Sequence, residues 1–213
     1  MSALHYAAAA CALAYLFICN RDESLFRSVL KTASVAILAL VALVAGGPVL
    51  LVAALALCGL GDWLLSRPGD GSFMAGVGAF AAGHLAYIAL FLTHPLADLS
   101  LLAHTPRLRV MVALALLGLF MARLLGPRAG DLRGPVLAYI PIILGMGAAV
   151  LVLPLTGPLI WAGVGAALFI GSDMMLATDK FVLGDRHPLR AVAGYAVWST
   201  YWLAQFAFLI AFT

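Results

Sequence analysis

The sequence predicts an all-α, polytopic membrane protein with eight transmembrane helices. Of its 213 residues, 65% are hydrophobic and only 10% are charged, whereas a soluble domain is typically about 25% charged. Apolar runs of about 20 residues recur along the whole chain, and each is long enough to cross the ~30 Å hydrocarbon core of a bilayer. Because lipid offers no hydrogen bonds to the backbone, such runs must satisfy their own, and helices do so.

Polar or glycine- and proline-rich breaks separate the first four spans. The run at about 2–19 has no basic segment before it and ends in CNRDES, so we expect a retained helix and not a signal peptide. RDESLFR precedes the run at 28–45, and GGP leaves only a tight turn before the run at 48–66. SRPGDG precedes the run at 73–93.

The last four spans are separated in the same way. They are expected at about 108–126, 134–153, 157–177 and 190–212, after the segments THPLADLSLLAHTPR, GPRAGDLRGP, PLTGP and TDKFVLGDRHPLR. None of these connections leaves room for a soluble domain, so we expect a single transmembrane domain over residues 1–213. The chain is expected to be a monomer or a homodimer.

Basic residues predict how the chain lies in the membrane. Of its 12 Lys and Arg residues, all but Arg107 and Arg109 lie on the side of the connections that follow the odd-numbered spans. Such residues accumulate on the cytoplasmic side, so we expect both termini to be extracytoplasmic, in a bacterial inner (plasma) membrane. The bases flank helices instead of forming one patch, so no nucleic-acid partner is expected.

Three cysteines, Cys11, Cys19 and Cys58, lie in or at the ends of apolar runs, where they resemble small buried apolar residues. Their odd number and the lack of zinc-type spacing argue against a disulfide framework or a structural metal. We therefore expect no metal and no cofactor.

Two acidic residues, Asp62 in ALCGLGDWLL and Asp173 in ALFIGSDMML, lie inside apolar spans. An ionised side chain near the bilayer interior costs about 2.5–3.5 kcal/mol on insertion scales. The two patterns are similar and lie four spans apart, which is compatible with a parallel duplication of four-helix halves. Two such costs in one chain indicate a functional site.

Further polar groups are predicted at similar depths on other spans. His84 is 11 residues past Phe73 and so ~16 Å into its span, near the midplane. Most of the others fall in the cytoplasmic half, which predicts a cavity opening towards the cytoplasmic leaflet. They are Lys31, Tyr139, Tyr201 and Gln205, with Tyr87 on the same helix face as His84.

Each of these residues also has a simpler interpretation. Asp62 could pair with Lys31 or Arg67, and Asp173 with Lys180, at the ends of their helices. Lys31 could extend its ammonium group to the interface. The buried His, Tyr and Gln side chains could serve only as hydrogen bonds between helices.

The combined motifs resemble the YhhN family of lysoplasmalogenases. The likeness lies in G-D-x-L-L followed by F-x-x-G-x-x-x-F-x-x-x-H-x-x-Y, in G-A-x-x-F-x-x-S-D, and in a final Tyr and Gln. The matching positions are Gly61, Asp62, Phe73, Gly76, Phe80, His84, Tyr87, Gly165, Ala166, Phe169, Ser172, Asp173, Tyr201 and Gln205.

The resemblance implies hydrolysis of the sn-1 vinyl ether bond of a lysoplasmalogen to a fatty aldehyde and glycerophosphoethanolamine or glycerophosphocholine. That chemistry needs an acid that protonates carbon, a base that activates water, and negative charge near the resulting oxocarbenium ion. We therefore expect Asp62 and Asp173 as acid and base in an order left open, with His84 also in the catalytic set. Lys31 is expected to meet the substrate phosphate, and the rest of the binding site is expected to include Tyr87, Tyr139, Ser172, Tyr201 and Gln205.

Two other functions are compatible with the same residues. A zinc-dependent hydrolase would need about three converging ligands, and His84 is the only histidine well inside a span. A proton-coupled transporter of a small or lipid-like solute could use the same buried acids as a proton relay. A serine hydrolase finds no support, because the chain contains no G-x-S-x-G motif.

Overall fold

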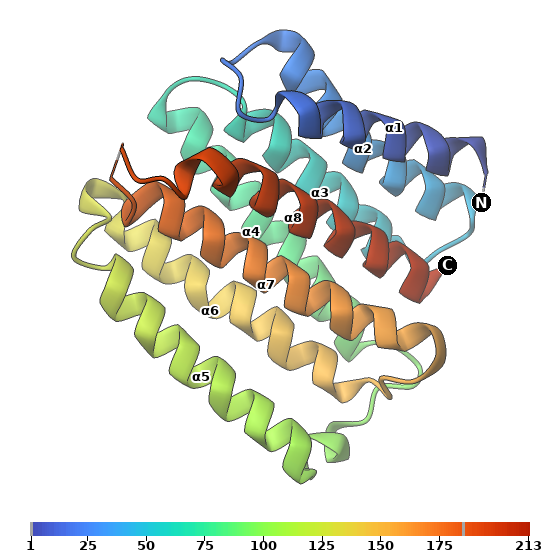
Figure 1. Ribbon diagram of the computed structural model, residues 1–213. Coiled ribbons are helices and arrows are strands. Elements are labelled where there is room, and N and C mark those ends of the chain that lie inside the picture. Colours follow the sequence, from blue (N-terminus) through green and yellow to red (C-terminus); the bar gives the residue numbers. More distant parts are fainter. Residues whose placement is uncertain (1, 185) are drawn as a thin grey trace.

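The computed structural model describes residues 2–184 and 186–213, which form eight α-helices and no strand (Figure 1). The helices are α1 (Ala3–Ile18), α2 (Leu25–Val44), α3 (Val49–Leu65), α4 (Asp70–Leu92), α5 (Thr105–Leu125), α6 (Arg133–Ala149), α7 (Ile160–Phe181) and α8 (Arg190–Phe212). Short 3-10 helices, η1 (Leu99–Ala103), η2 (Gly130–Leu132), η3 (Val150–Val152) and η4 (Gly157–Leu159), lie in the connections. The all-α prediction is confirmed.

Six helical segments among the described residues are long and apolar enough to cross a membrane. They contain α2, α4, α5, α6, α7 and α8, which makes the chain an integral membrane protein. The other two helices, α1 and α3, have 16 and 17 residues, or about 24–26 Å of length. That is shorter than the ~30 Å hydrocarbon core, so the crossing by all eight helices stays a prediction.

Local sequence sets the ends of α2 and α3. Ser24 caps α2, because its side-chain oxygen accepts a hydrogen bond from the Arg27 backbone N–H at 3.2 Å. The helix therefore begins before the predicted start at residue 28. In the tight turn to α3, Gly46 has a φ of 71°, a conformation that glycine adopts without steric cost.

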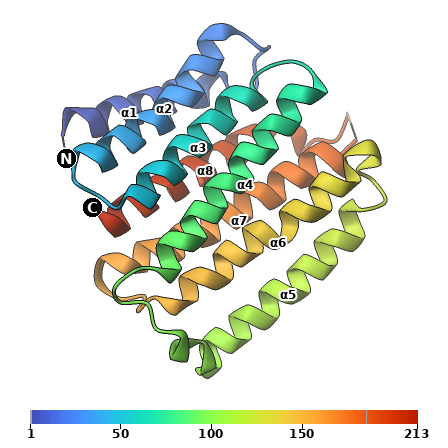
Figure 2. The same ribbon diagram turned by 180° about the vertical axis from the view of Figure 1, so that it is seen from behind.

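The order of the helices in space differs from their order in the chain (Figures 1 and 2). Neighbours in sequence pack as α1 on α2, α2 on α3, α3 on α4 and α7 on α8, whereas α4 packs on α6. The helix α5 lies at one edge of the bundle, against α6. Besides α7, α8 contacts α1, α2 and α3, so the last helix joins the two halves of the chain. The predicted duplication of these halves stays a prediction.

Candidate active site

A cavity of about 490 Å³ lies inside the bundle, and all eight helices contribute to its wall. Most of the lining residues come from the part of each helix near the α1–α2, α3–α4, α5–α6 and α7–α8 connections. These are the connections with most of the Lys and Arg residues. The cavity therefore occupies the half of the bundle for which the sequence predicted it, and the cytoplasmic location of that half stays a prediction.

The carboxylate of Asp62 on α3 is 1% exposed and has partners on two other helices. The Lys31 ammonium group on α2 lies 3.1 Å from Asp62 Oδ1. The Tyr201 hydroxyl on α8 donates a hydrogen bond to Asp62 Oδ2 at 2.7 Å. Lys31 and Arg67 were both possible partners of Asp62 from the sequence, and Lys31 is the one that pairs with it. The Arg67 guanidinium lies over the Trp63 ring, 4.3 Å from its centroid.

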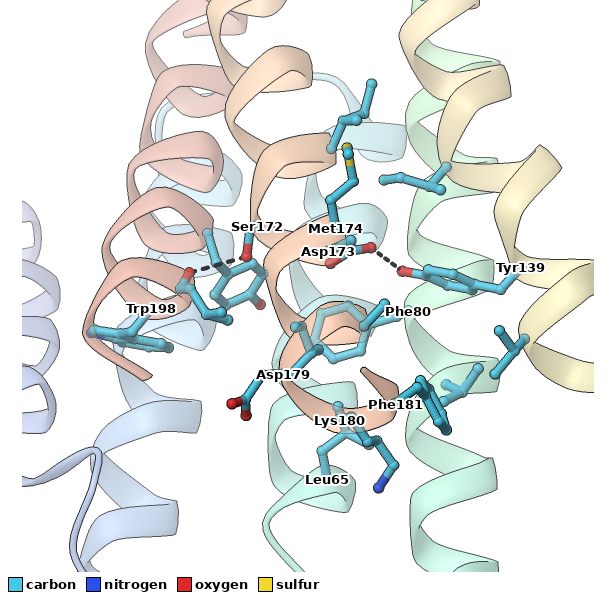
Figure 3. Close-up of a pocket in the computed structure, with 18 of the residues that line it drawn as sticks. Leu65, Phe80, Tyr139, Ser172, Asp173, Met174, Asp179, Lys180, Phe181 and Trp198 are labelled. Atoms are coloured by element: carbon cyan, nitrogen blue, oxygen red, sulfur yellow. Dashed lines mark hydrogen bonds between the residues drawn. The ribbon is translucent and has the colours of Figure 1, made fainter. Parts of the chain in front are cut away.

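The second carboxylate, Asp173 on α7, lines the same cavity with a different partner (Figure 3). The Tyr139 hydroxyl on α6 donates a hydrogen bond to Asp173 Oδ2 at 2.7 Å. Within the described part of the chain, Asp173 forms no ion pair with a Lys or Arg side chain. Lys180 was a possible partner of Asp173 from the sequence, but its ammonium nitrogen lies 3.9 Å from the centroid of the Phe73 ring.

Behind this wall, His84 on α4 is fully buried and adjoins the Asp173 pair. Its Nδ1 lies 2.7 Å from the Phe80 carbonyl oxygen and 3.4 Å from the Tyr139 hydroxyl. A carbonyl oxygen can only accept, so Nδ1 carries a proton. The other ring nitrogen, Nε2, is buried and has no hydrogen-bond partner among the described residues.

Three other predicted binding residues form bonds between helices. The Tyr87 hydroxyl donates to Gln205 Oε1 at 2.5 Å, which joins α4 to α8, and both side chains are fully buried outside the residues that line the cavity. The Ser172 hydroxyl lines the cavity and donates to the Val197 carbonyl oxygen on α8 at 3.0 Å. This is the simpler interpretation that the sequence left open for Gln205.

Several residues of the cavity wall were not among the predicted site residues. Arg27, Asp179 and Arg190 line it near the helix ends, where Arg190 Nε lies 3.4 Å from Asp179 Oδ1. An apolar part of the wall comes from α5 and α6 and includes Leu117, Met121 and Ile140. Arg27 could have been predicted from the sequence, because it precedes Lys31 by one helical turn. No local sequence pattern indicates that the residues of α5 line the cavity.

Within residues 2–184 and 186–213, no group of three or more His, Cys, Asp or Glu side chains is arranged to hold a metal ion. The polar contacts of the site are instead carboxylate, phenol, ammonium and imidazole groups, which exchange protons and hydrogen bonds.

Proteins named lysoplasmalogenase from Mycobacterium bovis and Mycobacterium tuberculosis are each 36% identical to this chain over 138 residues. The match covers 63% of this chain and 51% of each relative, so the chain spans about half the length of these relatives. No solved structure matches. The sequence profile of the YhhN family matches residues 26–212, and the chain belongs to the YhhN family.

Proposed function

We propose that this protein is a lysoplasmalogenase, a hydrolase that cleaves the sn-1 vinyl ether bond of a lysoplasmalogen. One observation carries the proposal: two carboxyl groups with different partners, the buried Asp62 and the half-buried Asp173, line a single cavity. The similarity to proteins named lysoplasmalogenase supports it. We further propose one transmembrane domain in a bacterial inner membrane, with the site facing the cytoplasmic leaflet.

The cavity is chemically suited to a lipid with one chain. Its volume of about 490 Å³ lies within the range of about 300–1,000 Å³ that is usual for ligand pockets. Leu117, Met121 and Ile140 give it an apolar side, while charged groups lie near the helix ends. A single alkenyl chain would occupy the apolar side and leave the glycerol and headgroup among the charged groups.

Hydrolysis of a vinyl ether begins with two proton transfers in sequence and ends with the collapse of a hemiacetal. An acid first protonates the alkene carbon one bond away from the ether-bearing carbon, which leaves an oxocarbenium ion. Water then adds to the cationic carbon and gives its proton to a base. The resulting hemiacetal then loses its hydroxyl proton while the glycerol oxygen gains one and the bond between the carbon and that oxygen breaks, which gives a fatty aldehyde and the free glycerol hydroxyl.

The partners of the two carboxyl groups suggest which one acts as acid. Burying an ionised carboxylate without a cation is costly, so the neutral form suits Asp173, whose described polar partner is the Tyr139 phenol. The Lys31 ammonium compensates the charge of Asp62. We therefore assign Asp173 as the general acid and Asp62 as the base that also stabilises the cation.

The test is release of fatty aldehyde from a lysoplasmalogen by the purified protein in detergent. We expect Asp173→Asn and Asp62→Asn each to lower kcat at least about 100-fold, the usual scale of acid–base catalysis. Asp131→Asn is the matched control, because Asp131 is an exposed carboxylate outside the cavity wall. Normal turnover by both folded variants would overturn the mechanism.

Aldehyde release by the wild-type protein also discriminates between hydrolysis and proton-coupled transport. Absence of aldehyde from folded wild-type protein would overturn the proposed reaction. It would favour the proton-coupled transporter, for which Asp173, Tyr139 and His84 form a connected set of proton-exchanging groups. Proton-coupled uptake into liposomes would then be the measurement.

A further inference from the structure

Four cationic side chains line the cavity, and their partners divide them into two classes. Lys31 and Arg190 each form an ion pair with a carboxylate, Asp62 and Asp179 respectively. Arg27 and Lys180 form no ion pair with any described carboxylate. These two positive charges at the cavity are therefore left without a described counter-charge.

Aromatic rings hold both of the unpaired cations in position. The Arg27 guanidinium lies 5.8 Å from the centroid of the Tyr15 ring, and the Lys180 ammonium nitrogen lies 3.9 Å from that of the Phe73 ring. Such contacts orient a cation by its attraction to the ring face but do not neutralise its charge. Arg27 Nε is also buried and has no hydrogen-bond partner among the described residues. An anion would satisfy both groups.

Each of the two cations lies one or two helical turns from a residue that forms the carboxylate site. Arg27 is one turn, about 6 Å, from Lys31, the residue that holds Asp62. Lys180 is two turns, about 10 Å, from Asp173 on the same helix, and both lie in the same wall. Both cations therefore lie nearer the helix ends than the carboxylates do, on the side where the phosphate of a lipid would lie if its sn-1 ether reached the carboxylates.

We propose that Arg27 and Lys180 bind the phosphate of the substrate headgroup. The sequence pointed to Lys31 for this role, but its ammonium group is paired with Asp62. A guanidinium can bind two phosphate oxygens at once, and a lysine adds a compact charge. This inference rests on the proposed function for its ligand, a lysophospholipid, and concerns binding instead of turnover.

The experiment measures binding of two single-chain lipids to the protein in detergent. One is an sn-1 alkyl lysophosphoethanolamine, whose saturated ether has no alkene carbon to protonate and so is not hydrolysed. The other is the matching alkylglycerol without phosphate. We expect Arg27→Gln and Lys180→Gln together to raise the Kd of the phospholipid about tenfold or more, and to change that of the alkylglycerol less than twofold.

Controls separate headgroup recognition from general charge and from packing. Arg123→Gln removes an exposed cation at the same end of the bundle but outside the cavity wall, and it should leave both Kd values unchanged. Lys180→Gln alone changes only an exposed side chain, and it should raise the Kd of the phospholipid more than that of the alkylglycerol. An equal loss of affinity for both lipids, or no loss for either, would overturn the proposal.

A third ligand distinguishes a lipid headgroup from free phosphate. Glycerophosphoethanolamine should compete with the alkyl lysophospholipid only at much higher concentration, because it lacks the chain. If it bound as tightly as the lipid, the site would be one for soluble phosphate, and the headgroup assignment would be wrong. All three arms measure binding, so an absence of wild-type turnover would refute the proposed reaction without deciding this one.

Discussion

At the residue scale, the site depends on a buried ion pair and on a second acid without a cation. Lys31→Met would leave the Asp62 carboxylate, 1% exposed, without its ammonium partner. Breaking a buried pair from one side typically costs about 3–5 kcal/mol. We expect a loss of about 3 kcal/mol in the free energy of unfolding, measured by denaturant titration in detergent. The double variant Lys31→Met/Asp62→Asn should recover most of it, and a fully stable single variant would contradict the pair's role.

The two phenols at the carboxyl groups should differ in their effect on turnover. Tyr139→Phe removes the hydrogen bond to Asp173, which becomes a bond to a charged group, worth about 1.5–3 kcal/mol, as Asp173 gives up its proton. We expect kcat to fall about 10- to 100-fold. Tyr201→Phe should cost less than Tyr139→Phe, because Lys31 still holds Asp62. Aldehyde release by the two folded variants gives the comparison, and the opposite order would count against Asp173 as the acid.

Some residues of the candidate site could be predicted from the sequence alone, and others could not. The acids Asp62 and Asp173 could be singled out because a charge in an apolar run carries a known cost. The sequence also placed Tyr87 and Gln205 with them, but the structure bonds these two to each other outside the cavity wall. Periodicity gives the face of a helix on which a residue lies, and it does not give the helix that covers that face.

At the element scale, close packing of α7 on α8 holds Asp173 and Tyr201 in one site. A Cβ added at Gly165 would lie 2.9 Å from the Phe208 ring and 3.0 Å from the Ala204 carbonyl oxygen. Because the backbone oxygen cannot move aside, Gly165→Ala should destabilise the protein by about 1–3 kcal/mol. Gly171→Ala, on the same helix with no heavy atom within 4 Å of the added carbon, should be neutral or slightly stabilising.

Thermal unfolding in detergent compares these two variants under identical conditions. Equal Tm values for Gly165→Ala and Gly171→Ala would show that the α7–α8 approach is looser than the distances indicate. Aldehyde release should follow stability in this pair, because neither glycine lines the cavity.

Helices could be predicted better than their arrangement. Hydropathy reports long apolar runs directly, so each predicted span overlaps one observed helix. Their ends moved by a few residues where local chemistry acts, as with the Ser24 cap of α2. The packing of α4 on α6, and of α8 on α1, α2 and α3, could not be predicted, because side-by-side order depends on shape at distant residues and leaves no local pattern.

At the scale of the whole molecule, the cavity and the basic connections lie at the same end of the bundle, and both termini lie at the other (Figure 1). The orientation of the chain in the membrane therefore decides which leaflet the cavity faces. If the basic end faces the cytoplasm, the cavity opens at the inner leaflet and substrate headgroups would enter from that side. If it faces outwards, the site would draw on the outer leaflet.

Reporter fusions decide between these two orientations. Alkaline phosphatase fused after Thr213 should be active and green fluorescent protein fused there should be dark, because the positive-inside rule puts this end outside the cytoplasm. Fusions after Arg128, in the connection between α5 and α6, should give the reverse pattern and serve as the matched control. The same pattern at both positions would mean that an even number of the three helices between them crosses the membrane, contrary to eight spans. Reversal at both would keep the spans and move the site to the outer leaflet.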